Sequence, residues 1–145
     1  MSAVLPGGYV LPMLFTSDGA ITVGSPVYRS AAGVIKTCSD SDDPTTQTKD
    51  VFGVFNGTAK GGDAADGDAT CEVAIGPCEV NCGATLTAGD MVWAAFSATS
   101  GETVVKTGPT LTDGDYTLGQ CFGDGASGGK IAVDVRPNRI TYTDT

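Results

Sequence analysis

Histidine is absent from this chain of 145 residues. The Ser-His-Asp and Cys-His arrangements that activate a nucleophile are therefore excluded, and the most common metal ligand is missing. Basic residues are also scarce, because 8 lysines and arginines stand against 17 acidic residues and give a formal net charge of −9. An acidic chain repels the phosphate backbone, so we expect no nucleic-acid partner. The sequence favours a binding or structural protein over an enzyme, with no catalytic residue and no cofactor.

Long apolar runs are missing as well. No stretch approaches the roughly 18 residues that a membrane helix needs, so we expect no membrane association. The first residues lack a basic region, and Pro6 and Pro12 interrupt the apolar stretch that a signal peptide would need. We therefore expect synthesis in a cytoplasm without secretion by the usual route.

Glycine, by contrast, is abundant and stands between short apolar runs. The 21 glycines and 7 prolines mark turns such as Asp66-Gly67. Between the turns, apolar residues such as Ile131, Val133 and Val135 alternate with other residues, which is the period of a half-buried strand. Since no convincing helix is present, the pattern predicts an all-β fold.

The β-type runs occur twice. The first copy contains the runs 21–28, 33–37, 51–55 and 71–77, and the second contains 86–93, 104–107, 116–122 and 131–137. Gly24 corresponds to Gly89 at an offset of 65, Lys36 to Lys106 at 70, Gly53 to Gly119 at 66 and Pro77 to Pro137 at 60. The offset changes where turn residues stand, as expected if only loops have changed length. The repeat predicts a duplicated small β-barrel or β-sandwich module.

The repeat divides the chain into an extended N-terminal arm over 1–20, a first β-module over 21–82, a second over 83–137 and a C-terminal tail over 138–145. The apolar side chains of the arm are Val4, Leu5, Tyr9, Val10, Leu11, Met13, Leu14 and Phe15. Something should cover such a segment. It could be a first strand folded onto its own lobe or an arm that lies on a neighbouring subunit. No turn-and-strand pattern pairs these residues within either module, which favours contact with another molecule.

Cysteines are the main remaining candidates for chemistry. Cys71 corresponds to Ile131 in the repeat, and Cys121 also falls on a core-facing position, so both are expected to act as small apolar side chains. Five cysteines without a secretion signal favour free thiols. Cys78 and Cys82 could instead pair in an oxidising setting, and a zinc site is a weaker alternative because their spacing does not suit one.

Two polar stretches are interpreted as turns. The acidic loop Asp63-x-x-Asp66-Gly-Asp68 lacks the spacing and the closing glutamate of a calcium loop, so solvated charge is the better interpretation. The segment Asn56-Gly57-Thr58 matches a glycosylation pattern. Without a secretory route it predicts a hairpin turn.

Two pairs of side chains stand out. Tyr28 and Trp93 hold equivalent positions in the repeat, which favours a shared packing role over a sugar-binding platform. Arg136 and Arg139 flank Pro137 and could pair with carboxylates of a partner, and solvated arginines are the alternative.

These motifs resemble those of a known family. The openings Ile21-Thr-Val-Gly-Ser-Pro-Val-Tyr28 and Leu86-Thr-Ala-Gly-Asp-Met-Val-Trp93, the hairpin Gly33-Val-Ile-Lys36 and the strand Val51-Phe-Gly-Val54 are similar to those of the capsid decoration, or cement, proteins of tailed bacteriophages. The resemblance covers about residues 21–137. The cysteine content and the long inserts of the first module depart from the family pattern.

The resemblance implies a structural virion protein that binds the outer surface of an assembled phage capsid. It would stabilise the capsid by bridging copies of the major capsid protein, and it would be made in the host cytoplasm. Self-association as a trimer, or alternatively a dimer, is also implied, with Met1 to Phe15 as the main contact. The alternative function is a β-sandwich adhesin or carbohydrate-binding module of a phage tail or fibre. Exposed aromatic residues in a cleft would favour that alternative, and buried Tyr28 and Trp93 would favour cement.

Overall fold

The protein is all-β, as predicted. The computed structural model describes residues 2–37, 51–97, 102–106 and 116–139, and these form ten strands. The strands are β1 (Tyr9–Val10), β2 (Thr16–Ser17), β3 (Pro26–Ala31), β4 (Val34–Lys36), β5 (Val51–Thr58), β6 (Cys71–Asn81), β7 (Met91–Ser97), β8 (Glu102–Lys106), β9 (Tyr116–Cys121) and β10 (Lys130–Arg139). They form a sheet of order β2-β4-β3-β5-β6-β10-β9-β7-β8, with β1 paired to β6 off this path. In the described part of the chain, no helix could cross a membrane.

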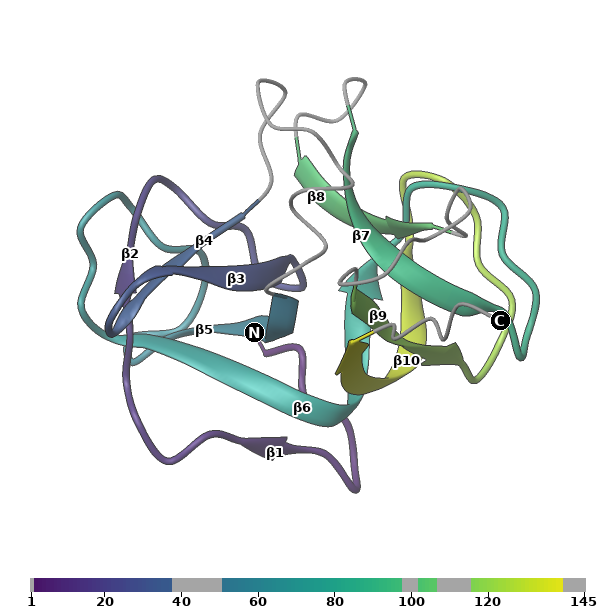
Figure 1. Ribbon diagram of the computed structural model, residues 1–145, viewed down its shortest axis with the longest axis horizontal. Coiled ribbons are helices and arrows are strands. Elements are labelled where there is room, and N and C mark those ends of the chain that lie inside the picture. The colour runs from purple at the N-terminus through teal and green to yellow at the C-terminus, as the bar shows by residue number, and fades with distance from the viewer. Residues whose placement is uncertain (1, 38–50, 98–101, 107–115, 140–145) are drawn as a thin grey trace, which may run out of the picture.

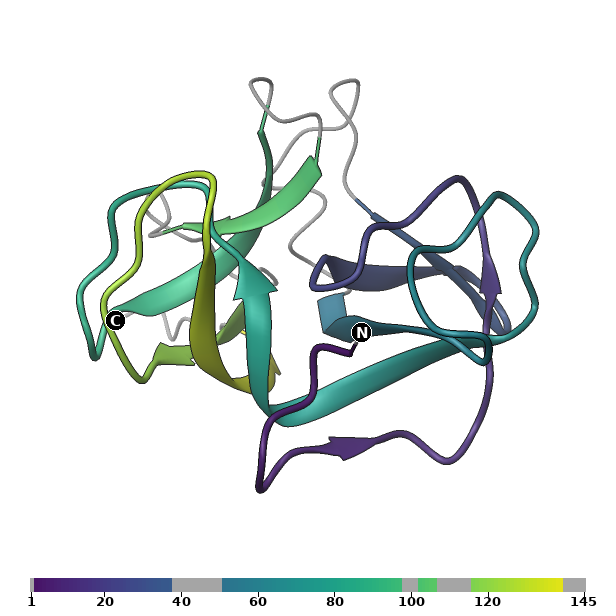
Figure 2. The same cartoon turned by 180° about the vertical axis from the view of Figure 1, so that it is seen from behind.

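The strands form two lobes that share β6. Figure 1 shows β2 to β5 in one lobe and β7 to β10 in the other, and Figure 2 shows β6 bending as it passes from one to the other. Residues 71–74 of β6 pair with β5, whereas residues 76–81 pair with β10. The bend coincides with Gly76, whose φ of 78° suits glycine.

The repeat seen in the sequence recurs as a repeat of strand pairing. Strands β3, β4, β5 and β6 of the first module correspond to β7, β8, β9 and β10 of the second. The pairs Ser17–Ile35, Tyr28–Lys36 and Phe55–Val73 recur as Cys82–Val105, Trp93–Lys106 and Cys121–Val133. Each residue is displaced by the offset that the sequence predicts for its part of the module. The two modules therefore have the same strand arrangement.

The N-terminal segment belongs to the first module, which corrects the predicted boundaries. Phe15 pairs with Cys71 just as Val80 pairs with Ile131. The N-terminal segment thus pairs with the last strand of the first module, and the second half of β6 pairs in the same way with the last strand of the second module. The first module begins within the predicted arm and the second begins within β6, not at residues 21 and 83. Of the predicted tail, residues 138–139 extend β10, and 140–145 lie outside the described residues.

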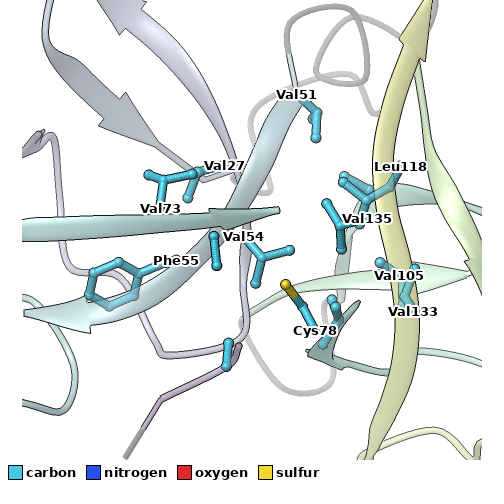
Figure 3. Packing of buried hydrophobic residues seen from close by; sticks show 14 of the residues in the cluster. Val27, Val51, Val54, Phe55, Val73, Cys78, Val105, Leu118, Val133 and Val135 are labelled. Atoms are coloured by element: carbon cyan, nitrogen blue, oxygen red, sulfur yellow. The ribbon is translucent and has the colours of Figure 1, made fainter. Parts of the chain in front are cut away.

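One continuous core runs through both lobes. Val27, Phe55 and Val73 lie inside the first lobe. At the junction, Figure 3 shows Val54 of β5 pointing toward Val135 of β10, and both side chains are buried. Burying a side chain of this size contributes about 1.5–3 kcal/mol, so the junction is a substantial part of the fold.

A polar joint also fixes the lobes to one another. Lys130 of the second module donates from Nζ to the Val23 carbonyl (3.1 Å) and to Asn81 Oδ1 (2.7 Å). The backbone N–H of Asn81 donates to the Gly24 carbonyl at 3.0 Å. A hollow of about 250 Å³ lies beside this joint, and Thr22 and Cys82 are among its lining residues. Groups from outside its own module therefore help to hold the turn at Gly24, in addition to the bond from the Gly24 N–H to the Phe55 carbonyl.

Candidate interaction site

The carboxylates of the acidic loop fix turns. Asp63 Oδ1 accepts a hydrogen bond from the Val23 N–H at 2.9 Å, and Asp66 Oδ1 accepts one from the Gly19 N–H at 2.8 Å. Asp68 accepts from the Thr70 hydroxyl and N–H, which lowers the pKa of this carboxyl. No cluster of three or more potential metal ligands occurs within the described ranges. The loop therefore has a structural use for its charge.

The four described cysteines are buried and free: Cys71, Cys78, Cys82 and Cys121. Burial raises the pKa of Cys71 and Cys121, and it raises the pKa of Cys78 to about 11 with a smaller contribution from the nearby Asp134 charge. Thiols of this kind are poor nucleophiles at neutral pH. The predicted core positions of Cys71 and Cys121 are confirmed. Cys38 lies outside the described residues.

Tyr28 and Trp93 have equivalent positions, since they pair with Lys36 and Lys106 respectively. Trp93 is only 3% exposed, and Tyr28 is half-buried and packs against the core. The indole of Trp93 is therefore not available as a platform for a sugar ring, and a packing role accounts for both side chains.

The N-terminal segment pairs with β6 of its own chain. The N–H groups of Leu5, Leu11 and Phe15 donate to carbonyls of β6 at 2.8–2.9 Å. Figure 2 shows this segment running beneath β6. The sequence offered no pairing pattern for these residues within either module, but the structure pairs them with β6, as in the alternative of a first strand folded onto its own lobe. Proline and glycine interrupt the alternation of the segment, so its strand character is hidden in the sequence.

Asn56 anchors the start of this segment. Its Oδ1 accepts hydrogen bonds from the N–H groups of Ala3 (2.8 Å) and Val4 (2.9 Å), and its Nδ2 donates to Glu72 Oε1 (3.1 Å). Asn56 is buried within β5, so the predicted hairpin turn at 56–58 is wrong. Instead, the β5–β6 pairing shifts register between Phe55 and Gly57.

The predicted contact residues divide between the inside and the outside of the molecule. Phe15 is 3% exposed, and its ring lies 5.5 Å from that of Phe52. The half-buried members of the segment are Val4, Leu5, Val10 and Leu11. The members that face solvent are Tyr9 (57% exposed), Met13 (52%) and Leu14 (52%). We call Tyr9, Met13 and Leu14 the apolar strip; these are the apolar residues of the predicted contact that a partner can reach.

Of the two predicted arginines, the structure describes the side chain of Arg136 alone. Arg136 is exposed, and its Nε lies 2.8 Å from Asp134 Oδ2. It is therefore solvated but has a partner in its own chain. Arg139 is the last residue of β10, and its side chain lies outside the described part of the structure.

A hollow that sequence reasoning missed lies on the second module. Its volume is about 400 Å³, and its lining includes Met91, Gln120, Asp134 and Arg136. Asp134 Oδ1 is covered and has no hydrogen-bond partner among the described residues. The available signal was a comparison of the two copies, because Gln120 stands where the first module has Val54, and Asp134 stands where it has Ala74.

Neither the known protein-family models nor the curated proteins include a match to this chain.

Proposed function

We propose that the protein is a capsid decoration protein that binds the outside of an assembled phage head and bridges copies of the major capsid protein. The observation that carries the proposal is the apolar strip, which begins on the edge strand β1 of a duplicated β-module and continues just after it. The motif resemblance over residues 21–137 supports the same function. In the virion the protein would lie on the capsid exterior, self-associated as a trimer, with a dimer as the alternative.

The edge formed by β1 suits the addition of a strand from a partner. Among the described strands, β1 pairs only with β6, so its other edge is not paired within the described chain. A partner strand laid along such an edge gains main-chain hydrogen bonds, and neighbouring side chains supply specificity. Tyr9 belongs to β1, and Met13 and Leu14 follow it, so apolar side chains accompany the open edge.

The charge of the chain fits a position outside the head. A formal net charge of −9 opposes binding to packaged nucleic acid and keeps the particle surface solvated. Each contact with the capsid need only be modest, because a self-associated cement binds several sites at once and gains avidity.

The test is co-sedimentation with assembled heads of the phage that encodes the chain, compared with unassembled capsid subunits. We expect wild-type protein to sediment with the heads alone. The triple variant Tyr9→Ser, Met13→Ser, Leu14→Ser should keep its far-UV circular dichroism and lose binding. The matched control is Phe122→Ser, which removes an equally exposed apolar side chain (57%) from the other module. Binding of the triple variant at the wild-type level would refute a role for the strip, and failure of wild-type protein to bind would refute the proposed function.

A further inference from the structure

The junction between the two lobes joins two different faces. The first module contributes an outer face of its sheet, which carries Val54 and its cross-strand partner Ala74. The second contributes one end of its lobe, where Leu118 and Val135 lie, and β5 contacts both β9 and β10 there. We call these the outer face and the lobe end. Because each module has both, the contact is heterologous, like the head-to-tail contacts that build rings and chains.

The outer face changes character between the copies. In the first module Pro26, Val54 and Ala74 are all buried, and Val54 faces the second lobe at the junction. Their counterparts in the second module are Met91, Gln120 and Asp134, all of which line the open hollow of about 400 Å³. Met91 is 47% exposed. The second module thus presents the same face as an open hollow, in which Asp134 Oδ1 is covered and Met91 and Gln120 are exposed.

The lobe end changes in the opposite direction. In the second module Ala94, Leu118 and Val135 are at most 1% exposed. Their counterparts in the first module are Arg29, which is exposed, and Phe52 and Ile75, which are half-buried. The Arg29 guanidinium lies 5.0 Å from the centre of the Phe52 ring, so a cation stands at this free end.

The two free faces are complementary in charge. Asp134 stands on the outer face where the first module has Ala74, and Arg29 stands at the lobe end where the second module has Ala94. Asp134 already has an ion pair with Arg136, but that arginine is 80% exposed. Exposed ion pairs are weak, so Oδ2 of Asp134 can exchange Arg136 for a second guanidinium, whereas Oδ1 is covered.

We propose that copies of this protein associate head to tail, with the Arg29–Phe52 lobe end of one copy seated on the Gln120–Asp134 outer face of the next. The association repeats between copies the junction that already joins the modules within one chain. A head-to-tail contact repeats the same rotation from each copy to the next, and it gives a closed ring if these rotations add up to a full turn. This inference deepens the proposed function, because it names the surfaces through which a cement would self-associate, and it rests on that function only for its use on the capsid.

The test uses one blocked variant for each face. Arg29→Glu reverses the charge at the lobe end, and Met91→Arg places a long cation in the hollow. The control Lys60→Glu makes the same charge change as Arg29→Glu at an exposed loop residue. By light scattering coupled to size exclusion, we expect wild-type protein and Lys60→Glu to be oligomers. Arg29→Glu and Met91→Arg should each be monomers, with an affinity at least about tenfold weaker, a loss of roughly 1.4 kcal/mol.

Mixing the two blocked variants gives the decisive result. Each retains the face that the other has lost, so the mixture should contain a dimer that forms from neither variant alone. A self-complementary contact would instead stay broken in the mixture, and that result would overturn the proposal. A monomeric wild-type protein up to its solubility limit would also overturn it. Sedimentation of wild-type protein with capsids separates this failure from failure of the proposed function.

Discussion

Val54 and Gln120 occupy the same position in the two copies of the module, yet Val54 is fully buried and Gln120 is exposed. Both pair with an equivalent neighbour, since Val54 lies opposite Pro26 and Gln120 lies opposite Met91. The backbone therefore treats the two positions alike. What separates them is the second lobe, which covers the first position and not the second.

Val54→Ala should accordingly destabilise the protein, and Gln120→Ala should not. Removing two buried methyl groups and leaving a cavity at the junction costs about 2–3 kcal/mol of unfolding free energy. An exposed substitution usually changes stability by less than about 0.5 kcal/mol. Urea denaturation followed by circular dichroism measures both. Equal losses would mean that the junction does not cover Val54 in solution.

Phe15 and Leu14 form a second matched pair, because adjacent residues of the N-terminal segment face in and out. Phe15 is 3% exposed and Leu14 is 52% exposed. We expect Phe15→Ala to cost about 3–4 kcal/mol and Leu14→Ala less than about 0.5 kcal/mol. The same packing means that deleting residues 1–15 should unfold the protein. A deletion variant with unchanged stability would instead support the predicted arm that lies on a neighbouring subunit.

Gly24 and Gly89 test the polar joint. Both have positive φ, 91° and 93°, so alanine is strained at either position by about 1–2 kcal/mol. A Cβ at Gly89 would meet nothing within 4 Å, whereas one at Gly24 would lie 2.9 Å from both Asn81 Oδ1 and Lys130 Nζ. Gly24→Ala should therefore lower the thermal midpoint further than Gly89→Ala. Equal thermal midpoints for the two variants would show that Asn81 and Lys130 can move aside without a loss of stability.

Cys78 gives a prediction for alkaline pH. Its pKa is raised from 9.0 to about 11 by burial. Between these values the unfolded thiol loses its proton while the folded one keeps it, so unfolding is increasingly favoured as pH rises. The contribution of Cys78 to stability should be constant below pH 9 and should be lost as pH approaches 11. Cys78→Ala should be less stable at neutral pH but show a shallower fall, as urea denaturation across this range would reveal. A wild-type slope no steeper than that of the variant would contradict the shift.

The repeat could be derived from the sequence because turn glycines and alternating strands are local signals. Gly24 and Gly89, for example, fix the two modules in register before any packing is known. The use of β6 by both modules could not be derived, because the Gly76-Pro77 dipeptide at its bend looks like the end of a strand. The hollow at Gln120 was also out of reach. Aligning the sequences of the two copies matches Gln120 with Val54, but which of the two side chains is covered depends on how the lobes pack.

The sharing of β6 also bears on how the molecule comes apart. Melting the first module would release residues 71–74 of β6, which continue directly into residues 76–81 that pair with β10. Because one core runs through both lobes, neither lobe can open alone without exposing the core of the other. The chain should lose its structure in a single cooperative transition despite its two-part design. A protease that cut between Cys82 and Leu86 would separate two halves of the sequence but not two folding units.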